Sequence, residues 1–281
     1  MPSFTAADGR RLHYLDEGEG PPVLCLAGLS RNHRDFDPLA AHLRGRFRVL
    51  RLDGRGRGRS DHAEHPLQEY SPQVEAGDAL GLLAHLGLTG VGLVGTSRGG
   101  VLGMMMAAGR PGSVAALALN DVGAELELPG LLRILAYLGR PPTALSFAEA
   151  AERLARDNAA QFPNVGLARW EAHARAIYDD DAGRPVLSYD PHLSAATGAA
   201  LDMEMPHVDL WPLFEAVKAI PVLVIRGANS DILSAETLAR MAREHPGLAQ
   251  VTIADRGHAP FLDEPEALAA LDAFLTEHLP P

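Results

Sequence analysis

Short apolar runs alternate with longer amphipathic stretches along the first 121 residues. The runs read PPVLCLAG at 21–28, FRVLRLD at 47–53 and VGLVGTS at 91–97. An apolar run of this length predicts a strand that is buried on both faces, and the helical patterns between the runs predict crossover helices. The alternation therefore predicts an α/β fold class, with a mostly parallel central sheet that is flanked by helices.

The alternation stops after Asp121. The stretch 122–212 is rich in helical patterns, is broken by prolines and offers no convincing buried strand. The strand pattern restarts with IPVLVIRGANSD at 220–231, and one further strand and an amphipathic helix follow. We therefore expect one core formed by residues 1–121 and 213–281, and a helical cap or lid formed by residues 122–212.

Composition and charge narrow the classes of protein to consider. Of the 281 residues, 47% are hydrophobic and 22% are charged, as is usual for soluble globular proteins. The net charge of -11 disfavours nucleic acid and anionic membranes as partners. The N-terminus lacks a signal-peptide pattern, and no apolar stretch is long enough to span a bilayer. We expect a cytoplasmic protein that acts on a small molecule.

A sharp turn around Ser97 carries the first sign of catalysis. The stretch LVGTSRGG at 93–100 contains the pattern G-x-S-x-G between a predicted strand and a predicted helix, which is the context of a nucleophile elbow. The flanking glycines leave room for a tight turn. Such a turn exposes Ser97 Oγ and aims the backbone N–H of Arg98 at the position where an oxyanion would form. We therefore predict Ser97 as a nucleophile.

A serine nucleophile needs a base, and the base needs a carboxylate to orient it. His258 lies in the loop RGHAP after the last predicted strand, and Asp231 follows the end of the preceding strand. We predict His258 as the base and favour Asp231 as the acid. Asp255 is close to His258 in sequence, but it belongs to the strand end itself and is geometrically less attractive.

The order Ser, Asp, His along the chain resembles the α/β-hydrolase family, in its capped, esterase-like form. The resemblance runs from PPVLCLAG through GTSRGG to RGHAPFLDEP. It implies a second oxyanion donor, because the residue after a His-Gly pair usually supplies that N–H in the family. Here the loop reads Ala27-Gly28-Leu29, which assigns the donor to Leu29. Some family members carry the acid after the earlier strand, which makes Asp121 the rival of Asp231.

The family resemblance also implies the reaction. A serine enzyme of this kind hydrolyses a carboxylic ester or lactone through an acyl-enzyme, and it needs no metal and no organic cofactor. Two alternatives stay open. One is the hydrolysis of a carbon–carbon bond in a diketone-like acid, and the other is a hydrolase-like receptor with little turnover.

The segment RLDGRGRGRSD at 51–61 combines four arginines with three glycines. It could be a nucleic-acid strip, a phosphate loop or a tight turn. It does not open a helix, as a dinucleotide loop does, and it lacks the aromatic residues that would stack on bases. In the α/β-hydrolases the fourth strand is followed by a turn of the form D-x-x-G-x-G-x-S, which residues 53–60 resemble. We interpret it as a scaffold turn whose arginines reach solvent or carboxylates.

The remaining histidines give no metal site. The chain has 12 histidines but no H-E-x-x-H or H-x-H spacing, and its single cysteine excludes a cysteine cluster. His62 and His65 are close in sequence but lack companion ligands, so we interpret them as solvated.

Overall fold

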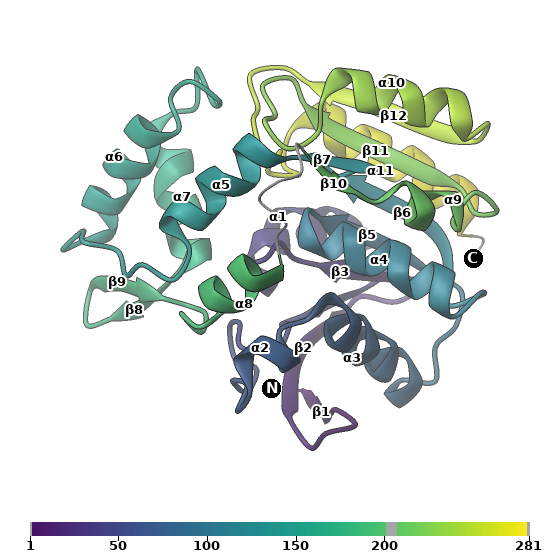
Figure 1. The fold of residues 1–281 in the computed structure, drawn as a ribbon, viewed down its shortest axis with the longest axis horizontal. Coiled ribbons are helices and arrows are strands. Elements are labelled where there is room, and N and C mark those ends of the chain that lie inside the picture. Colours follow the sequence, from purple (N-terminus) through teal and green to yellow (C-terminus); the bar gives the residue numbers. More distant parts are fainter. Residues whose placement is uncertain (1, 201–206, 280–281) are drawn as a thin grey trace.

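The computed structural model describes residues 2–200 and 207–279, and an eight-stranded sheet runs through its middle (Figure 1). The strand order is β1-β2-β4-β3-β5-β6-β11-β12. All neighbouring strands from β4 to β12 are parallel, whereas β1 and β2 form an antiparallel edge. The bounds are β1 (Ser3–Thr5), β2 (Arg11–Glu17), β3 (Pro22–Leu26), β4 (Arg48–Leu52), β5 (Val91–Thr96), β6 (Val114–Asn120), β11 (Val222–Gly227) and β12 (Leu248–Ile253). This topology confirms the predicted fold class.

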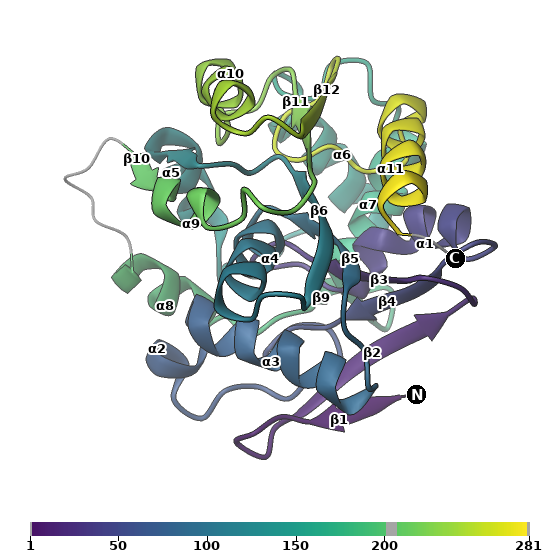
Figure 2. The ribbon, with the colours of Figure 1, turned by 90° about the vertical axis from the view of Figure 1, so that its right-hand side faces the viewer.

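Each buried strand contributes side chains to two apolar layers, because successive side chains point to opposite faces of a sheet. In β3, Leu24 and Leu26 belong to the layer under α3, α4, α9 and α10, whereas Val23 and Cys25 belong to the layer under α1 and α11. Figure 2 shows α3 and α4 on the side of the sheet opposite α1 and α11. The bounds are α1 (Asp37–Leu43), α3 (Pro72–His85), α4 (Arg98–Gly109), α9 (Trp211–Glu215), α10 (Ala235–Glu244) and α11 (Pro265–His278). Burial on both faces explains why β3 reads as an uninterrupted apolar run.

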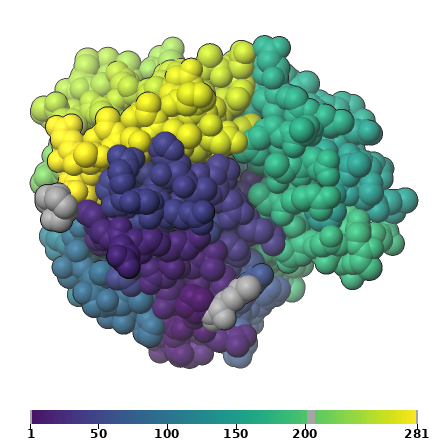
Figure 3. All heavy atoms as spheres, turned by 180° about the vertical axis from the view of Figure 1, so that it is seen from behind, coloured from purple at the N-terminus to yellow at the C-terminus, as the bar shows by residue number. Residues whose placement is uncertain are grey.

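A group of helices lies beside the sheet, and we call residues 128–200 the helical segment. Figure 1 places it to the left of the sheet, and Figure 3 shows its atoms on one flank of the molecule. Its elements are α5 (Leu128–Tyr137), α6 (Phe147–Asp157), α7 (Leu167–Ile177), β8 (Tyr178–Asp181), β9 (Arg184–Leu187) and α8 (Leu193–Ala200). β7 (Glu125–Glu127) pairs with β10 (His207–Asp209), so the chain enters and leaves this region along adjacent strands.

The range 122–212 contains more β-structure than its sequence pattern indicated. β7, β8, β9 and β10 all fall within it, and nearly all of their residues are half-buried or exposed. At its end, α9 begins at Trp211, and Phe214 of the same helix is fully buried against the sheet. Core packing therefore begins before residue 213. Across residues 2–200 and 207–279, none of the helices combines the length and apolar character that crossing a membrane requires.

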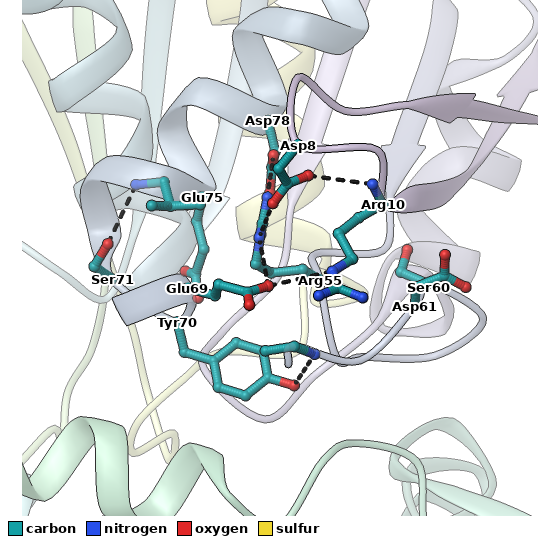
Figure 4. A network of polar contacts seen from close by, with 12 residues as sticks. Asp8, Arg10, Arg55, Ser60, Asp61, Glu69, Tyr70, Ser71, Glu75 and Asp78 are labelled. Carbon is teal, nitrogen blue, oxygen red and sulfur yellow. Dashed lines mark hydrogen bonds and ion pairs between the residues drawn. The ribbon is translucent and has the colours of Figure 1, made fainter. Parts of the chain in front are cut away.

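The arginine-rich segment is a turn after β4, and buried ion pairs stabilise it. Arg55 is 1% exposed, and it donates to Asp78 at 2.7 and 2.8 Å, to Asp8 at 2.8 Å and to Glu69 at 3.1 Å (Figure 4). Gly58 has a φ of +55°, and a Cβ there would lie 2.5 Å from the Asp53 carboxylate. The glycines therefore let the backbone pass close to side chains that it encloses. The arginines serve the scaffold, as the sequence predicted.

A further short 3-10 helix and an α-helix complete the elements around this turn. They are η1 (His33–Phe36) and α2 (Pro66–Glu69). The loop between β3 and η1 lies next to the turn, because Arg57 Nε donates to the carbonyl oxygen of Leu29 at 2.8 Å.

Candidate active site

Three polar side chains meet where parallel strands end. Ser97 follows β5, Asp121 follows β6, and His258 lies in the loop between β12 and α11. Because β5, β6, β11 and β12 are parallel, their carboxyl ends share one edge of the sheet. Open α/β sheets place their ligand sites at this edge.

The turn at Ser97 depends on its glycines. Ser97 has φ 51° and ψ -116°, and α4 begins at the next residue. A Cβ on Gly95 would lie 2.5 Å from the backbone of Gly100, and a Cβ on Gly99 would lie 2.0 Å from the carbonyl oxygen of Leu26. No larger residue fits at either position without a shift of backbone. The turn therefore holds Ser97 Oγ at the strand end, above the N-terminus of α4.

Ser97, His258 and Asp121 form one chain of hydrogen bonds. Ser97 Oγ lies 2.9 Å from His258 Nε2, and His258 Nδ1 lies 2.8 Å from Asp121 Oδ2. With a proton on Nδ1 that donates to the carboxylate, Nε2 is free to accept the hydroxyl proton of Ser97.

Asp121 is itself fixed by donors. Its side chain is fully buried, its Oδ1 accepts from the backbone N–H of Gly227 at 2.8 Å, and its Oδ2 accepts from Ser230 Oγ at 2.6 Å. These bonds compensate for burial of the carboxylate and hold it beneath the imidazole. The contact of Ser230 with Asp121 could not be predicted from the sequence, because Ser230 belongs to no motif.

The predicted contact between Asp231 and His258 is wrong. Arg133 of α5 donates from Nε to Asp231 Oδ2 at 2.6 Å and from Nη2 to Oδ1 at 2.9 Å. Although burial raises the pKa of Asp231, the pair with Arg133 holds it below its ordinary value. The carbonyl oxygen of Asp231 also lies against Gly130, where a Cβ would approach it to 2.3 Å. The loop after β11 is thus packed against the helical segment, and Asp121 takes the place beside His258.

The number of residues between each aspartate and the end of the strand before it is a signal that could have favoured Asp121 over Asp231 as the acid. Asp121 comes directly after β6, whereas Asp231 stands four residues beyond the end of β11. Asp255, the third acid considered, accepts from Asn164 Nδ2 at 3.0 Å, whereas Asp121 is the carboxylate beside His258 Nδ1.

The two predicted oxyanion donors belong to loops that one buried glutamate joins. Glu75 of α3 is 4% exposed, and its oxygens accept from Arg57 Nη1 and from Arg98 Nε, each at 2.8 Å. Arg57 in turn holds the carbonyl oxygen of Leu29. Although burial raises the pKa of Glu75, the charges of Arg57 and Arg98 hold it below its ordinary value. Glu75 is therefore ionised at neutral pH and connects the Leu29 loop to the first residue of α4.

A cavity of about 540 Å³ opens next to Ser97 and His258. The loop after β3, the loop after β12 and helices α5 and α7 border it. Much of its wall is apolar, namely Leu29, Ile134, Leu154, Phe162, Trp170 and Phe261. Trp170 and Phe261 pack edge to face with centroids 5.8 Å apart, so Trp170 both lines the cavity and joins the helical segment to the core.

One buried cluster has the ligand types and spacing of a metal site. Nitrogens of His13 and His33 and a carboxylate oxygen of Asp53 all lie within 4.8 Å of one another. Asp53 already accepts from both imidazoles at 2.9 Å, from the N–H of His33 at 2.8 Å and from the N–H of Arg59 at 3.1 Å. These bonds satisfy the carboxylate directly. We therefore assign this cluster to the support of the turn after β4.

Comparisons with known proteins agree with this fold. A family model described as alpha/beta hydrolase fold matches residues 21–265. The 3-hydroxybutyrate-oligomer hydrolase of Cupriavidus necator is 35% identical over 275 residues, which cover 95% of this chain and 93% of that protein. The 2-(acetamidomethylene)succinate hydrolase of Mesorhizobium japonicum is 28% identical, with 88% and 84% covered. An alpha/beta hydrolase structure from Novosphingobium aromaticivorans has a TM-score of 0.90 and 42% identity, with 98% and 96% covered.

Proposed function

This chain belongs to the α/β-hydrolase family, and on that premise we propose that it is a serine hydrolase that cleaves a carboxylic ester through an acyl-enzyme. One observation carries the proposal. Ser97 Oγ, His258 and Asp121 are joined by hydrogen bonds of 2.9 and 2.8 Å at the edge of a cavity. A serine with a base and an orienting carboxylate in this order is the arrangement that activates a hydroxyl as a nucleophile.

The proposed reaction has two halves. His258 Nε2 takes the proton of Ser97 as Oγ attacks the ester carbonyl, and the imidazolium then donates that proton to the departing alcohol. In the second half, His258 takes a proton from water, the hydroxide attacks the acyl carbonyl, and Ser97 leaves with the proton returned from His258. The carboxylate of Asp121 stabilises the imidazolium in both halves.

The backbone N–H groups of Leu29 and Arg98 are the proposed oxyanion donors. Arg98 is the first residue of α4, so its N–H has no partner within the helix, and the helix dipole favours negative charge there. Loss of one such donor lowers turnover by about 100- to 1000-fold in enzymes of this type. The chemistry described needs neither a metal nor an organic cofactor.

Ester hydrolysis is favoured over the alternatives by one of the relatives. The relative from Cupriavidus necator acts on oligomers of a hydroxy acid, whose units are joined by ester bonds. We further propose that the helical segment acts as a cap, since α5 and α7 border the cavity. Lactone hydrolysis, carbon–carbon hydrolysis of a diketone-like acid and a receptor function remain as distinct outcomes of the test.

The test is a substrate panel assayed with wild type and Ser97→Ala. The panel contains p-nitrophenyl esters of graded chain length, two lactones and one diketo acid. We expect ester turnover by wild type and its near-complete loss in Ser97→Ala, with folding unchanged by circular dichroism. Turnover of the diketo acid alone would move the function to carbon–carbon hydrolysis. No turnover by folded wild type on any member would favour a receptor.

A further inference from the structure

Arginines outnumber carboxylates among the residues that line the cavity beside Ser97, in a protein whose net charge is -11. Its charged lining residues are Arg31, Arg34, Arg169, Arg175, Asp35 and Asp37. Each of these arginines has a carboxylate partner, which is Asp35 for Arg31 and Asp179, Asp263 and Glu171 for Arg34, Arg169 and Arg175. Of these partners only Asp35 lines the cavity, so guanidinium groups outnumber carboxylates on the cavity wall. A wall of this kind offers N–H donors to an anion. The cavity is therefore suited to a substrate that carries negative charge.

Arg31 is the cavity arginine that lies next to the nucleophile. A Cβ built on Gly28 would lie 3.3 Å from Arg31 Cγ and 3.8 Å from Ser97 Cβ, so the two side chains flank the same point. Asp35 fixes the guanidinium along one edge, because Arg31 Nε and Nη2 donate to its oxygens at 2.7 and 2.8 Å. This bidentate contact uses the N–H of Nε and one N–H of Nη2. Nη1 lies 3.4 Å from His173 Nε2.

The guanidinium of Arg31 also rests on the face of His173 from α7. Its Nη2 lies 3.4 Å from both ring nitrogens of His173. A donor in the ring plane at equal distances from both nitrogens would collide with ring atoms, so the contact is through the face. The imidazole contacts both Nη groups of Arg31 at 3.4 Å. Asp35 accepts two of the five N–H donors and a neutral imidazole can accept only one, so N–H donors of Arg31 remain for a ligand in the cavity.

His173 adds no positive charge at this end of the cavity. Burial and the positive charges of Arg31 and Arg169 hold the pKa of His173 well below its ordinary value of 6.5. Arg169 lies over the ring of Phe261 at 3.9 Å, and that ring is 5.1 Å from the ring of His173. His173 is consequently neutral at neutral pH.

We propose that Arg31, supported by Asp35 and His173, binds a free carboxylate of the substrate, so that the enzyme prefers esters of carboxylate-bearing molecules. The proposal rests on the ester-hydrolase function proposed above. A guanidinium held by one carboxylate can bind a second one through its other N–H groups, and charge-assisted bonds of this kind are strong in a cavity. Arg31 is a binding residue in this proposal, and Ser97 and His258 carry out the chemistry.

The experiment compares two substrates that differ in one charge. They are the linear dimer of 3-hydroxybutyrate and its C-terminal N-methylamide, each assayed for cleavage of the internal ester by product chromatography. Wild type should prefer the free acid. Arg31→Gln should lower kcat/KM for the free acid by about 10- to 100-fold, mainly through KM, which is the range for a bond to a charged group. For the amide we expect a change within about 3-fold.

Two further variants separate binding from folding. Arg31→Lys keeps the charge and should retain part of the preference for the free acid. Arg153→Gln removes one exposed positive charge from α6, outside the cavity lining, and should leave the preference unchanged. An equal loss on both substrates in Arg31→Gln would overturn the proposal and leave Arg31 a structural role. A wild-type enzyme that cleaves both substrates equally well would also overturn it.

Failure of the underlying function has a different signature. If wild type cleaves p-nitrophenyl butyrate and Ser97→Ala does not, the hydrolase assignment stands regardless of the charge preference. If wild type cleaves neither that ester nor the dimer, the proposed function itself fails.

Discussion

Asp121 and Asp231 stand at the ends of neighbouring parallel strands, yet the structure gives them different surroundings. Asp121 accepts bonds from the Gly227 backbone, from Ser230 and from His258, all within the sheet edge. Asp231 instead forms a two-point ion pair with Arg133 of the helical segment. The carboxylate of Asp121 is enclosed by the loops around Ser97 and His258, and that of Asp231 joins the core to the helical segment. A position after a strand therefore does not by itself define the acid of a triad.

The largest expected effect comes from removing the charge at the sheet edge. Asp121→Asn should lower kcat on a neutral ester by about 1,000- to 10,000-fold, because the amide favours the wrong imidazole tautomer and no longer stabilises the imidazolium. Asp231→Asn is the matched control and should change kcat/KM within about 5-fold, as an ion pair near the surface contributes little. Steady-state assays of both variants at equal folded concentration check the ranking. The reverse ranking would return the triad acid to Asp231.

A smaller loss should follow when the support of the oxyanion loops is removed. Glu75→Gln leaves Arg57 and Arg98 without their shared carboxylate and should lower kcat by about 10- to 100-fold with little change in KM. Breaking a buried ion pair also destabilises the fold, by about 3 kcal/mol or more.

The control for this variant is Glu69→Gln, which changes the same residue type in the same region. Glu69 contacts Arg10 and Arg55 but not the oxyanion loops. It should lower stability without lowering kcat of the folded enzyme. Equal kcat in folded Glu75→Gln and wild type would show that Glu75 supports the fold alone.

The smallest effect concerns stability and pH at the Asp231–Arg133 pair. The pKa of Asp231 is lower in the folded protein than its ordinary value of 3.8. Such a group stabilises the fold above its unfolded-state pKa, and the contribution is lost as pH falls through the folded-state pKa. The free energy of unfolding should therefore differ between wild type and Asp231→Asn by about 0.5 kcal/mol at pH 7. Urea unfolding should show the two proteins converging below about pH 4. A difference that grows toward acid pH would contradict this assignment.

The sequence predicted those parts of the site whose local backbone geometry requires particular residue types. The turn at Ser97 can be made only with small residues at Gly95 and Gly99, so the motif and the geometry are the same constraint. His258 was predicted as the base because its loop follows the last predicted strand, and the structure places its Nε2 2.9 Å from Ser97 Oγ. The alternation of apolar runs likewise predicted the parallel sheet.

The features that the sequence did not predict depend on contacts between residues that are far apart along the chain. Arg133 is 98 residues from Asp231 along the chain, and nothing in either local pattern indicates that they pair. In the sequence, Glu75 is an ordinary carboxylate on a predicted helix. Only the structure shows its contacts with Arg57 and Arg98. β8 has the sequence Tyr-Asp-Asp-Asp, which strand propensity does not favour, and its pairing with β9 defines it.

The most direct test of the central claim is the rate at which a fluorophosphonate labels Ser97 in three forms of the protein. The probe reports activation of the serine and needs no knowledge of the substrate. In wild type and Asp231→Asn, intact mass and peptide mapping should show one adduct on Ser97, formed at similar rates. In Asp121→Asn the rate should fall by orders of magnitude. Labelling of Asp121→Asn at the wild-type rate, or the absence of any Ser97 adduct in folded wild type, would contradict the account.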